Sequence, residues 1–167
     1  MSAVIMGDCN IIQWNVKMST RCQIAVEDAN GTVRSVYCHH DGYVTGVGTV
    51  LVQSYSTSER VEKLLSLGAL SSVGELLEQI PNEMVAVLLR IPHPSGCVAY
   101  HRDRGEDYRP PQKWNSADEL ADYVQKNFLG DYVYVFRDGN WYVKPCTKPS
   151  GWNKVVEILL ELKNEGS

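Results

Sequence analysis

The fold is decided by residues 132–144, which read YVYVFRDGNWYVK. Aromatic and β-branched residues, which favour strands, flank the central Asp138-Gly139 pair on both sides. An Asp-Gly pair readily supplies the two positive φ angles of a tight hairpin turn. The stretch therefore predicts a β-hairpin with strands at 132–136 and 141–144.

A second hairpin is predicted at residues 22–37, CQIAVEDANGTVRSVY. Residues alternate between two faces on both sides of Asn30-Gly31, a pair that also favours a tight turn. The apolar run 84–91 predicts a buried strand, with a core helix as the alternative, and residues 97–101 predict one more strand.

Short helices are predicted between these strands from apolar spacing and capping residues. Gly68 and Gly130 are expected to end two of them, and Ser-x-x-Glu capping boxes at Ser72 and Ser116 are expected to start two. The predicted helices cover residues 47–55, 58–67, 72–80, 116–128 and 152–162.

These elements show no regular alternation of strand and helix. Two hairpins, one or two further strands and about five short helices predict an α+β domain with a largely antiparallel sheet. The chain has 167 residues, 44% of them hydrophobic, enough for one core, and the predicted single domain spans residues 18–167. Residues 1–17 lack sustained periodicity and are predicted to be an N-terminal extension or an added edge strand.

Composition narrows the class of protein. The five cysteines include no Cys-x-x-Cys pair and are odd in number, which fits a reducing cytoplasm. No run of about 18 apolar residues predicts a membrane span, and the N-terminus lacks the pattern of a secretory signal. A net charge of −4 disfavours binding along nucleic acid backbones, which requires clustered Lys and Arg. Neither a membrane nor a nucleic acid is therefore a favoured partner.

Titratable residues gather in residues 36–43, VYCHHDGY, at the end of a predicted strand. His39 and Asp41 project from one face of an extended backbone, and His101 and Asp103 repeat the spacing. If the two strands were neighbours, the pairs would suit a divalent metal such as manganese, iron or zinc, whose bound water attacks a phosphodiester. The alternatives are ordinary turn chemistry and non-metal ligand binding by the same cluster. The candidate ligand-binding residues are His39, His40, Asp41, Tyr43, His101 and Asp103.

No catalytic residue is assigned. Cys38 and His39 are neighbours on a strand and point to opposite faces, so they form no dyad, and Cys38 is expected to be a core thiol. The glycine-rich segment 42–48 matches no nucleotide-binding fingerprint and predicts a plain turn, with anion binding at free amides as the alternative. Binding is accordingly favoured over enzymatic activity.

Aromatic residues of the 132–144 hairpin form a candidate protein-binding surface. One face of the hairpin is expected to pack on the core, and the other to be exposed near charged loop residues. Tyrosine and tryptophan are frequent at interface hot spots, whereas the scarcity of basic residues weakens a role in base stacking. The predicted interaction surface comprises Tyr132, Tyr134, Trp141, Tyr142, Arg104 and Arg109.

Three motifs carry a resemblance to a known family. They are the start Met18-Ser19-Thr20-Arg21, the Cys-His-x-Asp-Gly-Tyr turn at 38–43 and the segment AYHRDRGED at 99–107. In these motifs the chain resembles a family of small tailed-phage proteins of unassigned activity, over residues 18 to about 145. It departs from the family at His40, where relatives often have an aromatic residue, and at Val44, where they often have proline.

The resemblance implies a viral accessory protein and implies no reaction. Without a convincing catalytic set, we expect a phage effector that binds and inhibits a host protein in the host cytoplasm, for example a counter-defence protein. The alternative is a nucleotide- or metal-binding protein that uses the His-Asp cluster, either a sponge for a signalling nucleotide or a small metal-dependent phosphodiesterase.

Overall fold

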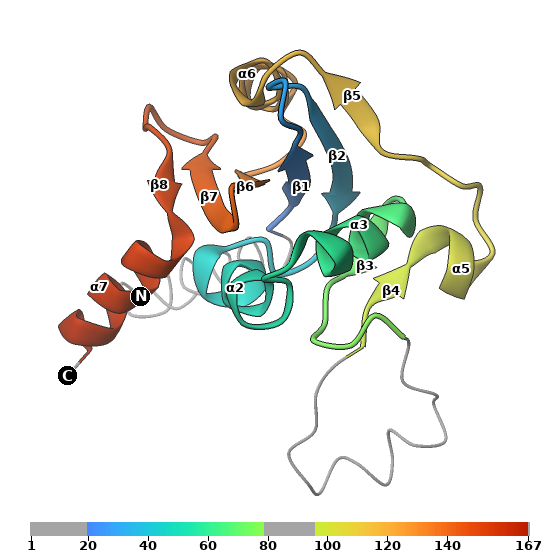
Figure 1. Ribbon diagram of the computed structural model, residues 1–167, viewed down its shortest axis with the longest axis horizontal. Helices are drawn as coiled ribbons and strands as arrows, with labels where there is room; N and C mark the ends of the chain where they lie inside the picture. The colour runs from blue at the N-terminus through green and yellow to red at the C-terminus, as the bar shows by residue number, and fades with distance from the viewer. Residues whose placement is uncertain (1–19, 79–95, 167) are drawn as a thin grey trace, which may run out of the picture.

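The computed structural model describes residues 20–78 and 96–166, which share one mixed sheet of eight strands (Figure 1). The sheet order is β4-β3-β2-β1-β6-β7-β8, and β5 also pairs with β2. The strands are β1 (Cys22–Glu27), β2 (Val33–Cys38), β3 (Leu70–Ser72), β4 (Val98–Ala99), β5 (Gln112–Trp114), β6 (Tyr132–Arg137), β7 (Asn140–Pro145) and β8 (Asn153–Lys154). The described helices are the π-helical turn η1 (Val44–Gly48) and the α-helices α2 (Thr49–Ser54), α3 (Ser58–Ser66), α5 (Tyr100–Arg104), α6 (Ala117–Asn127) and α7 (Val155–Glu165). The segment 1–17 and the strand predicted at 84–91 lie outside the described residues.

Both predicted hairpins are confirmed. β6 and β7 pair antiparallel from Tyr132↔Pro145 to Arg137↔Asn140, and Asp138 and Gly139 have φ angles of 50° and 79°. β1 and β2 pair antiparallel as well, but only Gly31 of the predicted turn pair has a positive φ. The first hairpin is therefore closed by a longer turn than the two-residue one that Asn-Gly predicts.

The α+β class is confirmed, whereas the expectation of a largely antiparallel sheet is wrong. The two hairpins meet through β1 and β6, which run parallel with Ile24 opposite Tyr134, and β2 also meets β3 in parallel. β1 and β6 are buried along nearly their whole length, so they take the centre of the sheet. The chain between the hairpins is long enough for the crossover that parallel pairing requires.

The sheet separates two apolar clusters. On one face, β-strand residues such as Ile24 and Tyr134 pack with Leu51 of α2, Leu64 of α3 and Val155 of α7. On the other face, among the described helices, α6 packs on the strands, with Trp114 and Trp152 at the edge of its cluster. Its cluster comprises Ala25, Val33, Val133 and Val135 from the strands and Ala117, Leu120, Ala121 and Val124 from the helix. Figure 1 shows α6 on the opposite side of the sheet from α2 and α3.

Helix α6 confirms its predicted capping box but ends earlier than predicted. Ser116 Oγ accepts the Glu119 amide proton at 3.1 Å, and the Glu119 carboxylate accepts the backbone amide proton of Asn115. The residue that takes the left-handed conformation is Phe128, with φ 54°, rather than Gly130. Helix α3 begins after Thr57, whose side chain accepts the Arg60 amide proton, and the predicted stop, Gly68, follows with φ 76°.

The second predicted capping box is wrong over the residues that the structure describes. Ser72 ends strand β3, and residues 73–78 contain no helix. The backbone there is bonded elsewhere: Tyr55 Oη donates to Gly74 O at 2.7 Å, and the Arg60 guanidinium donates to Glu75 O at 3.0 Å. Tertiary hydrogen bonds thus replace the helical ones that the local pattern favours.

Two further elements differ from their predictions. The strand predicted at 97–101 ends at Ala99, and α5 follows immediately, so Tyr100 and His101 are helical. The terminal helix α7 begins three residues later than predicted, after the short strand β8, and only Val155 of it is fully buried. No helix within residues 20–78 and 96–166 is long and apolar enough to cross a membrane.

Candidate functional site

The His-Asp-Gly-Tyr turn after β2 has a structural role in the observed geometry. Asp41 has a φ of 59° and its carbonyl oxygen accepts the Val47 amide proton at 2.8 Å, which starts η1. Tyr43 Oη donates to Asp41 Oδ1 at 3.4 Å. A Cβ on Gly42 would lie 2.9 Å from the Arg21 backbone, and one on Gly46 would lie 2.4 Å from Asp41 O. Close backbone approach therefore accounts for these glycines.

The second His-Asp pair lies on helix α5, so the expectation that it extends from a strand is wrong. Asp103 Oδ2 accepts the Ala99 amide proton at 2.7 Å and Asp103 pairs with Arg102, which fixes the start of the helix. His101 Nδ1 lies 2.8 Å from Glu106 O. Within the described ranges no three His, Cys, Asp or Glu side chains are grouped to hold a metal ion.

His39 and His40 close the end of β2. Their backbone amides donate to Leu70 O and Ser71 O, and their rings contact each other edge to face at 4.6 Å. Burial lowers the pKa of His39, and the neighbouring His40, Arg21 and Arg104 lower it further. His39 therefore lies near the guanidinium groups of Arg21 and Arg104. Cys38 beside the histidines is fully buried.

The predicted interaction residues do not form one surface. Tyr134 and Trp141 are core residues, 0% and 4% exposed, and their polar atoms donate to Gly42 O and Tyr55 O. Tyr132 is half-buried and stacks on Tyr134, while Tyr142 lies beneath the guanidinium of Arg137. Arg104 and Arg109 are exposed, but they follow β4, at the other end of the sheet order from β7.

A pocket that the sequence did not predict lies beside these residues. It occupies about 670 Å3 on the face of the sheet on which α6 packs. Its floor is strand residues of β1 and β2, and its wall is the loop before β5. The Gln23 pocket, as we call it, is lined by Arg21, Gln23, Ser35, Val36, Tyr37, Ala69, Tyr108, Arg109, Pro110, Pro111, Gln112 and Leu129.

The floor of the Gln23 pocket is polar and buried. Gln23 is 8% exposed and Ser35 is 1% exposed. Ser35 Oγ lies 3.2 Å from Gln23 Oε1 and accepts the Trp114 indole proton at 3.0 Å. A serine and a glutamine at inward positions of two central strands are the sequence signal for this pocket, because such positions are normally apolar.

Two of the predicted histidines support the tyrosines of this pocket. His39 Nδ1 lies 2.7 Å from Tyr37 Oη, and the His101 ring contacts the Tyr108 ring at 5.4 Å. Both tyrosines line the pocket. His39 and His101 thus contact residues that line the pocket and do not line it themselves.

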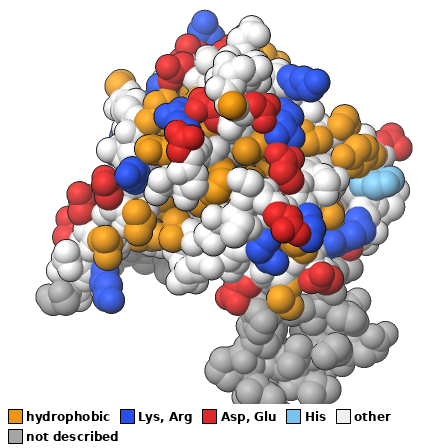
Figure 2. All heavy atoms as spheres, in the orientation of Figure 1, with side chains coloured by type: hydrophobic (Ala, Val, Ile, Leu, Met, Phe, Trp, Pro, Cys, Tyr) orange, Lys and Arg blue, Asp and Glu red, His pale blue; other side chains and the backbone are white. Residues whose placement is uncertain are grey.

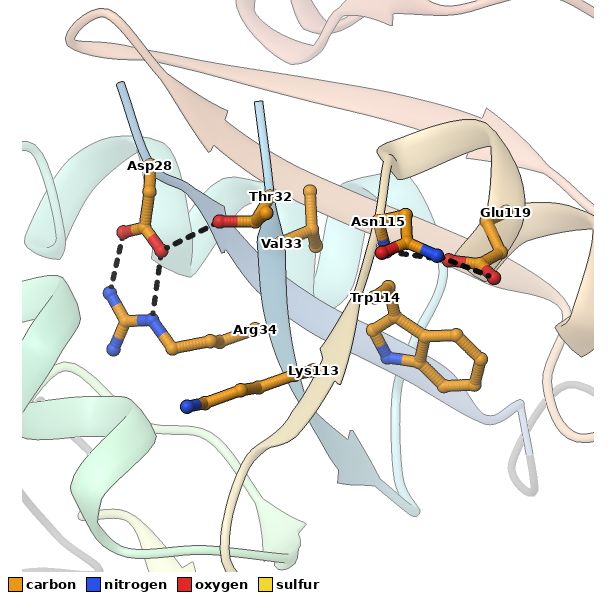
Figure 3. Close-up of a pocket in the computed structure, with 8 residues that line it drawn as sticks. All are labelled: Asp28, Thr32, Val33, Arg34, Lys113, Trp114, Asn115 and Glu119. Carbon is orange, nitrogen blue, oxygen red and sulfur yellow. Dashed lines mark hydrogen bonds and ion pairs between the residues drawn. The ribbon is translucent and has the colours of Figure 1, made fainter. Parts of the chain in front are cut away.

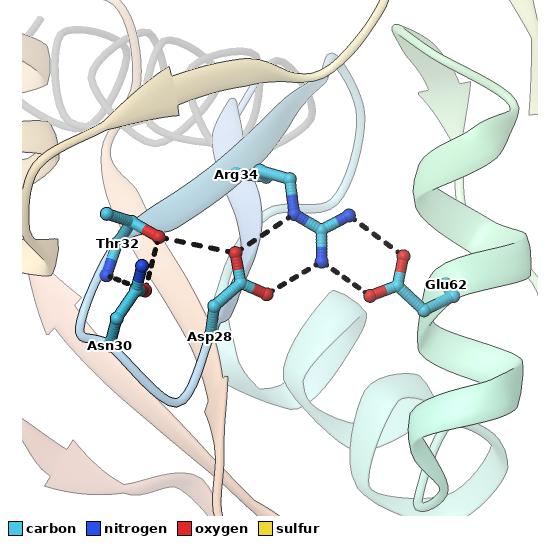
Figure 4. A network of polar contacts seen from close by, with 5 residues as sticks. All are labelled: Asp28, Asn30, Thr32, Arg34 and Glu62. Carbon is cyan, nitrogen blue, oxygen red and sulfur yellow. Dashed lines mark hydrogen bonds and ion pairs between the residues drawn. The ribbon is translucent and has the colours of Figure 1, made fainter.

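A second hollow, of about 550 Å3, lies at the turn end of β2 and β5 (Figure 3). The turn hollow, as we call it, is lined by Asp28, Thr32, Val33, Arg34, Lys113, Trp114, Asn115 and Glu119. Arg34 lies between Asp28 and Glu62 at 2.9 and 2.6 Å, joining the hairpin turn to α3 (Figure 4). Its hydrogen bonds lower the pKa of both carboxyl groups. Asp28 and Arg34 are therefore paired, and Glu119 accepts the Asn115 amide proton.

Exposed aromatic and aliphatic side chains gather around the end of α6. Phe128 is 81% exposed, and Tyr123 and Leu129 are also exposed. Trp114 packs against Tyr123, with ring centroids 5.0 Å apart. On the face seen in Figure 2, acidic and basic side chains are interspersed and form no continuous basic field.

Comparison of the chain with protein-family models, with curated proteins and with solved structures found no match.

Proposed function

We propose that this protein is a phage accessory protein that acts in the host cytoplasm by stoichiometric binding to a host protein, with counter-defence as its role. The resemblance of its motifs to small tailed-phage proteins supports the viral origin. The observation that carries the binding surface is the conformation and exposure of Phe128.

Phe128 has no folding role that explains its side chain. It ends α6 in the left-handed conformation, with φ 54° and ψ 39°, where glycine or asparagine is normally favoured. A bulky residue there costs about 1 kcal/mol. Its carbonyl accepts a hydrogen bond from Arg21 at 3.0 Å, while its ring is 81% exposed. A strained residue that presents an aromatic ring to solvent supports a role in binding.

The neighbours of Phe128 suit a protein partner. Tyr123 and Leu129 add exposed apolar surface, and Arg21 and Arg109 lie beside Leu129 around the Gln23 pocket. Aromatic residues with arginine are the composition of interface hot spots. The arginines favour a partner that presents an acidic surface. Interspersed surface charges and a net charge of −4 favour a protein over a nucleic acid.

The test replaces Phe128 by glycine. Phe128→Gly keeps the left-handed turn and removes the ring, so the free energy of unfolding should stay constant or rise by about 1 kcal/mol. Inhibition of the host should fall at least tenfold in potency. Leu160→Ser is the matched control, since Leu160 is 55% exposed on α7, on the other face of the sheet.

Stoichiometry distinguishes binding from turnover. A photo-crosslinker at position 128 should join the protein to one host protein, and inhibition should saturate near one equivalent of it, whereas a crosslinker at position 160 should not. Inhibition at a small fraction of an equivalent, crosslinks to nucleic acid, or full potency of Phe128→Gly would overturn the proposal.

A further inference from the structure

The Gln23 pocket presents hydrogen-bond donors, and the orientation of its floor follows from the network beneath it. The Trp114 indole N–H can only donate, so Ser35 Oγ accepts from it, and the single proton of Ser35 is left for Gln23. Gln23 must therefore offer Oε1 to Ser35 and direct its NH2 group elsewhere. A flipped amide would leave the proton of a 1% exposed serine without an acceptor.

Gln23 lines the pocket, and among residues 20–78 and 96–166 its hydrogen bond is to Ser35, through Oε1. No wholly buried side-chain nitrogen or oxygen of these residues lacks a hydrogen-bond partner. The NH2 group of Gln23 supplies two protons that an acceptor in the pocket can take. A pocket ligand that carries acceptor oxygens would satisfy them.

The charge of the pocket specifies the sign of that ligand. Arg21 and Arg109 line it, and the described lining residues include no carboxylate. Arg21 lies close enough to Tyr37 to oppose the rise that burial produces in the pKa of the phenol. In the described part of the chain Arg109 has no ion pair. Its backbone oxygen accepts the Ala69 amide proton at 3.2 Å, which fixes the loop to the sheet.

Two tyrosines and two prolines give the pocket flat apolar surfaces. Tyr37 is half-buried, and Tyr108 is 45% exposed with its Oη donating to Ser66 O at 3.0 Å. Gly68 allows this wall to approach: a Cβ there would lie 2.5 Å from Arg109 O and 2.9 Å from the Tyr108 ring. Pro110 and Pro111 stiffen the loop that follows.

We infer that the Gln23 pocket binds a small anionic molecule with a planar ring, of the nucleotide class. Arg21 and Arg109 would hold the phosphate, Gln23 would donate to acceptor oxygens, and Tyr37 or Tyr108 would stack on the ring. The volume of about 670 Å3 lies within the range of small-ligand pockets, about 300–1,000 Å3, and exceeds what one acidic side chain of a partner would fill. The pocket borders the proposed contact through Phe128, with which it shares Arg21, Arg109 and Leu129.

The test titrates the purified full-length protein with 5′-mononucleotides and cyclic dinucleotides by calorimetry. At least one of them should bind, and its nucleoside and inorganic phosphate, tested separately, should each bind at least tenfold more weakly. Gln23→Glu retains an oxygen for the Ser35 proton but replaces the two amide protons with negative charge. It should weaken binding at least tenfold with little change in thermal stability.

Arg109→Gln should also weaken binding at least tenfold, because it removes one cation from the pocket. The matched control is Lys113→Gln, a basic residue on β5 that lines the turn hollow, and it should leave the affinity unchanged. Phe128→Gly should also leave the affinity for the ligand unchanged. The inference would be overturned by no binding at about 1 mM of any of these ligands, or by equal affinity for phosphate alone. It would also be overturned if Gln23→Glu abolished only host-protein binding, which would assign the pocket to an acidic partner side chain.

Discussion

The turn hollow and the Gln23 pocket are both lined by residues of β2 and β5, but they differ in whether their charged groups have protein partners. In the turn hollow, Arg34 is held by two carboxylates, and Glu119 is held by Asn115 (Figures 3 and 4). In the Gln23 pocket, Gln23 and Arg109 line the hollow, and no carboxylate is among the described lining residues. Paired charges indicate a structural role, whereas arginines that line a pocket without a carboxylate indicate an anionic ligand.

Exposure strengthens the contrast. The ion pairs of Arg34 are partly open to water, and Glu62 is about half exposed. Water would therefore solvate each charged group if its partner were removed. Ser35 and Gln23 are nearly inaccessible, so their polar atoms depend on protein partners or on a ligand. The same kind of hydrogen bond is therefore expected to affect stability more in the Gln23 pocket.

The largest expected effect follows from removing a hydroxyl in each hollow. Ser35→Ala deprives the Trp114 indole proton of its acceptor and Gln23 Oε1 of its donor, so we expect a loss of about 2 kcal/mol in the free energy of unfolding. Thr32→Val is the counterpart in the turn hollow, where Thr32 Oγ1 donates to Asn30 Oδ1 near solvent. It should cost about 0.5 kcal/mol. Urea denaturation measures both, and equal losses would refute the contrast.

A smaller effect tests the paired charges of the turn hollow through pH. Arg34→Met should cost at most about 1 kcal/mol at neutral pH, because both ion pairs are partly exposed and screened. Arg34 lowers the pKa of Asp28 and Glu62 from their ordinary values of 3.8 and 4.5. A lowered folded-state pKa gives stability that is present above the ordinary values and lost as pH falls through the lowered ones.

The difference between wild type and Arg34→Met should thus be constant from neutral pH down to about pH 5 and shrink at lower pH. Denaturation curves across this range measure it. A difference that grows on acidification would show that another group accounts for the effect.

Local patterns predicted the elements whose hydrogen bonds are local. The Asp138-Gly139 turn and the Ser116 cap satisfy their own backbone groups, so neighbouring residues suffice to identify them. Ser72 has the same capping pattern and yet ends a strand, because Tyr55 and Arg60 bond the carbonyls after it. Those bonds join residues 15 or more positions apart, which no local window includes.

The parallel contact of β1 with β6 was unpredictable for a related reason. Both strands are apolar on both faces, and that pattern identifies them as central without saying which neighbour each takes. The Gln23 pocket was not predicted because the titratable residues indicated a site at the His-Asp cluster instead. His39 and His101 stand behind the pocket, whereas Gln23 and Ser35, which face it, carry no charge and are notable only for being polar at inward positions.

The smallest expected effect compares one basic residue from each hollow, Arg109 and Lys113, neither of which has an ion pair within the described ranges. Arg109 shares its pocket with Arg21 and no carboxylate, so Arg109→Met should relieve repulsion and stabilise the ligand-free protein by up to about 0.5 kcal/mol. Lys113 lies near enough to Asp28 to help lower the pKa of that carboxyl group, so Lys113→Met should destabilise by a similar amount. Denaturation at low ionic strength should show the opposite signs, and about 1 M salt should remove both shifts, because the Debye length falls to about 3 Å. Shifts of the same sign, or shifts that persist in salt, would mean that packing of the side-chain stems and not the charge environment separates the two hollows.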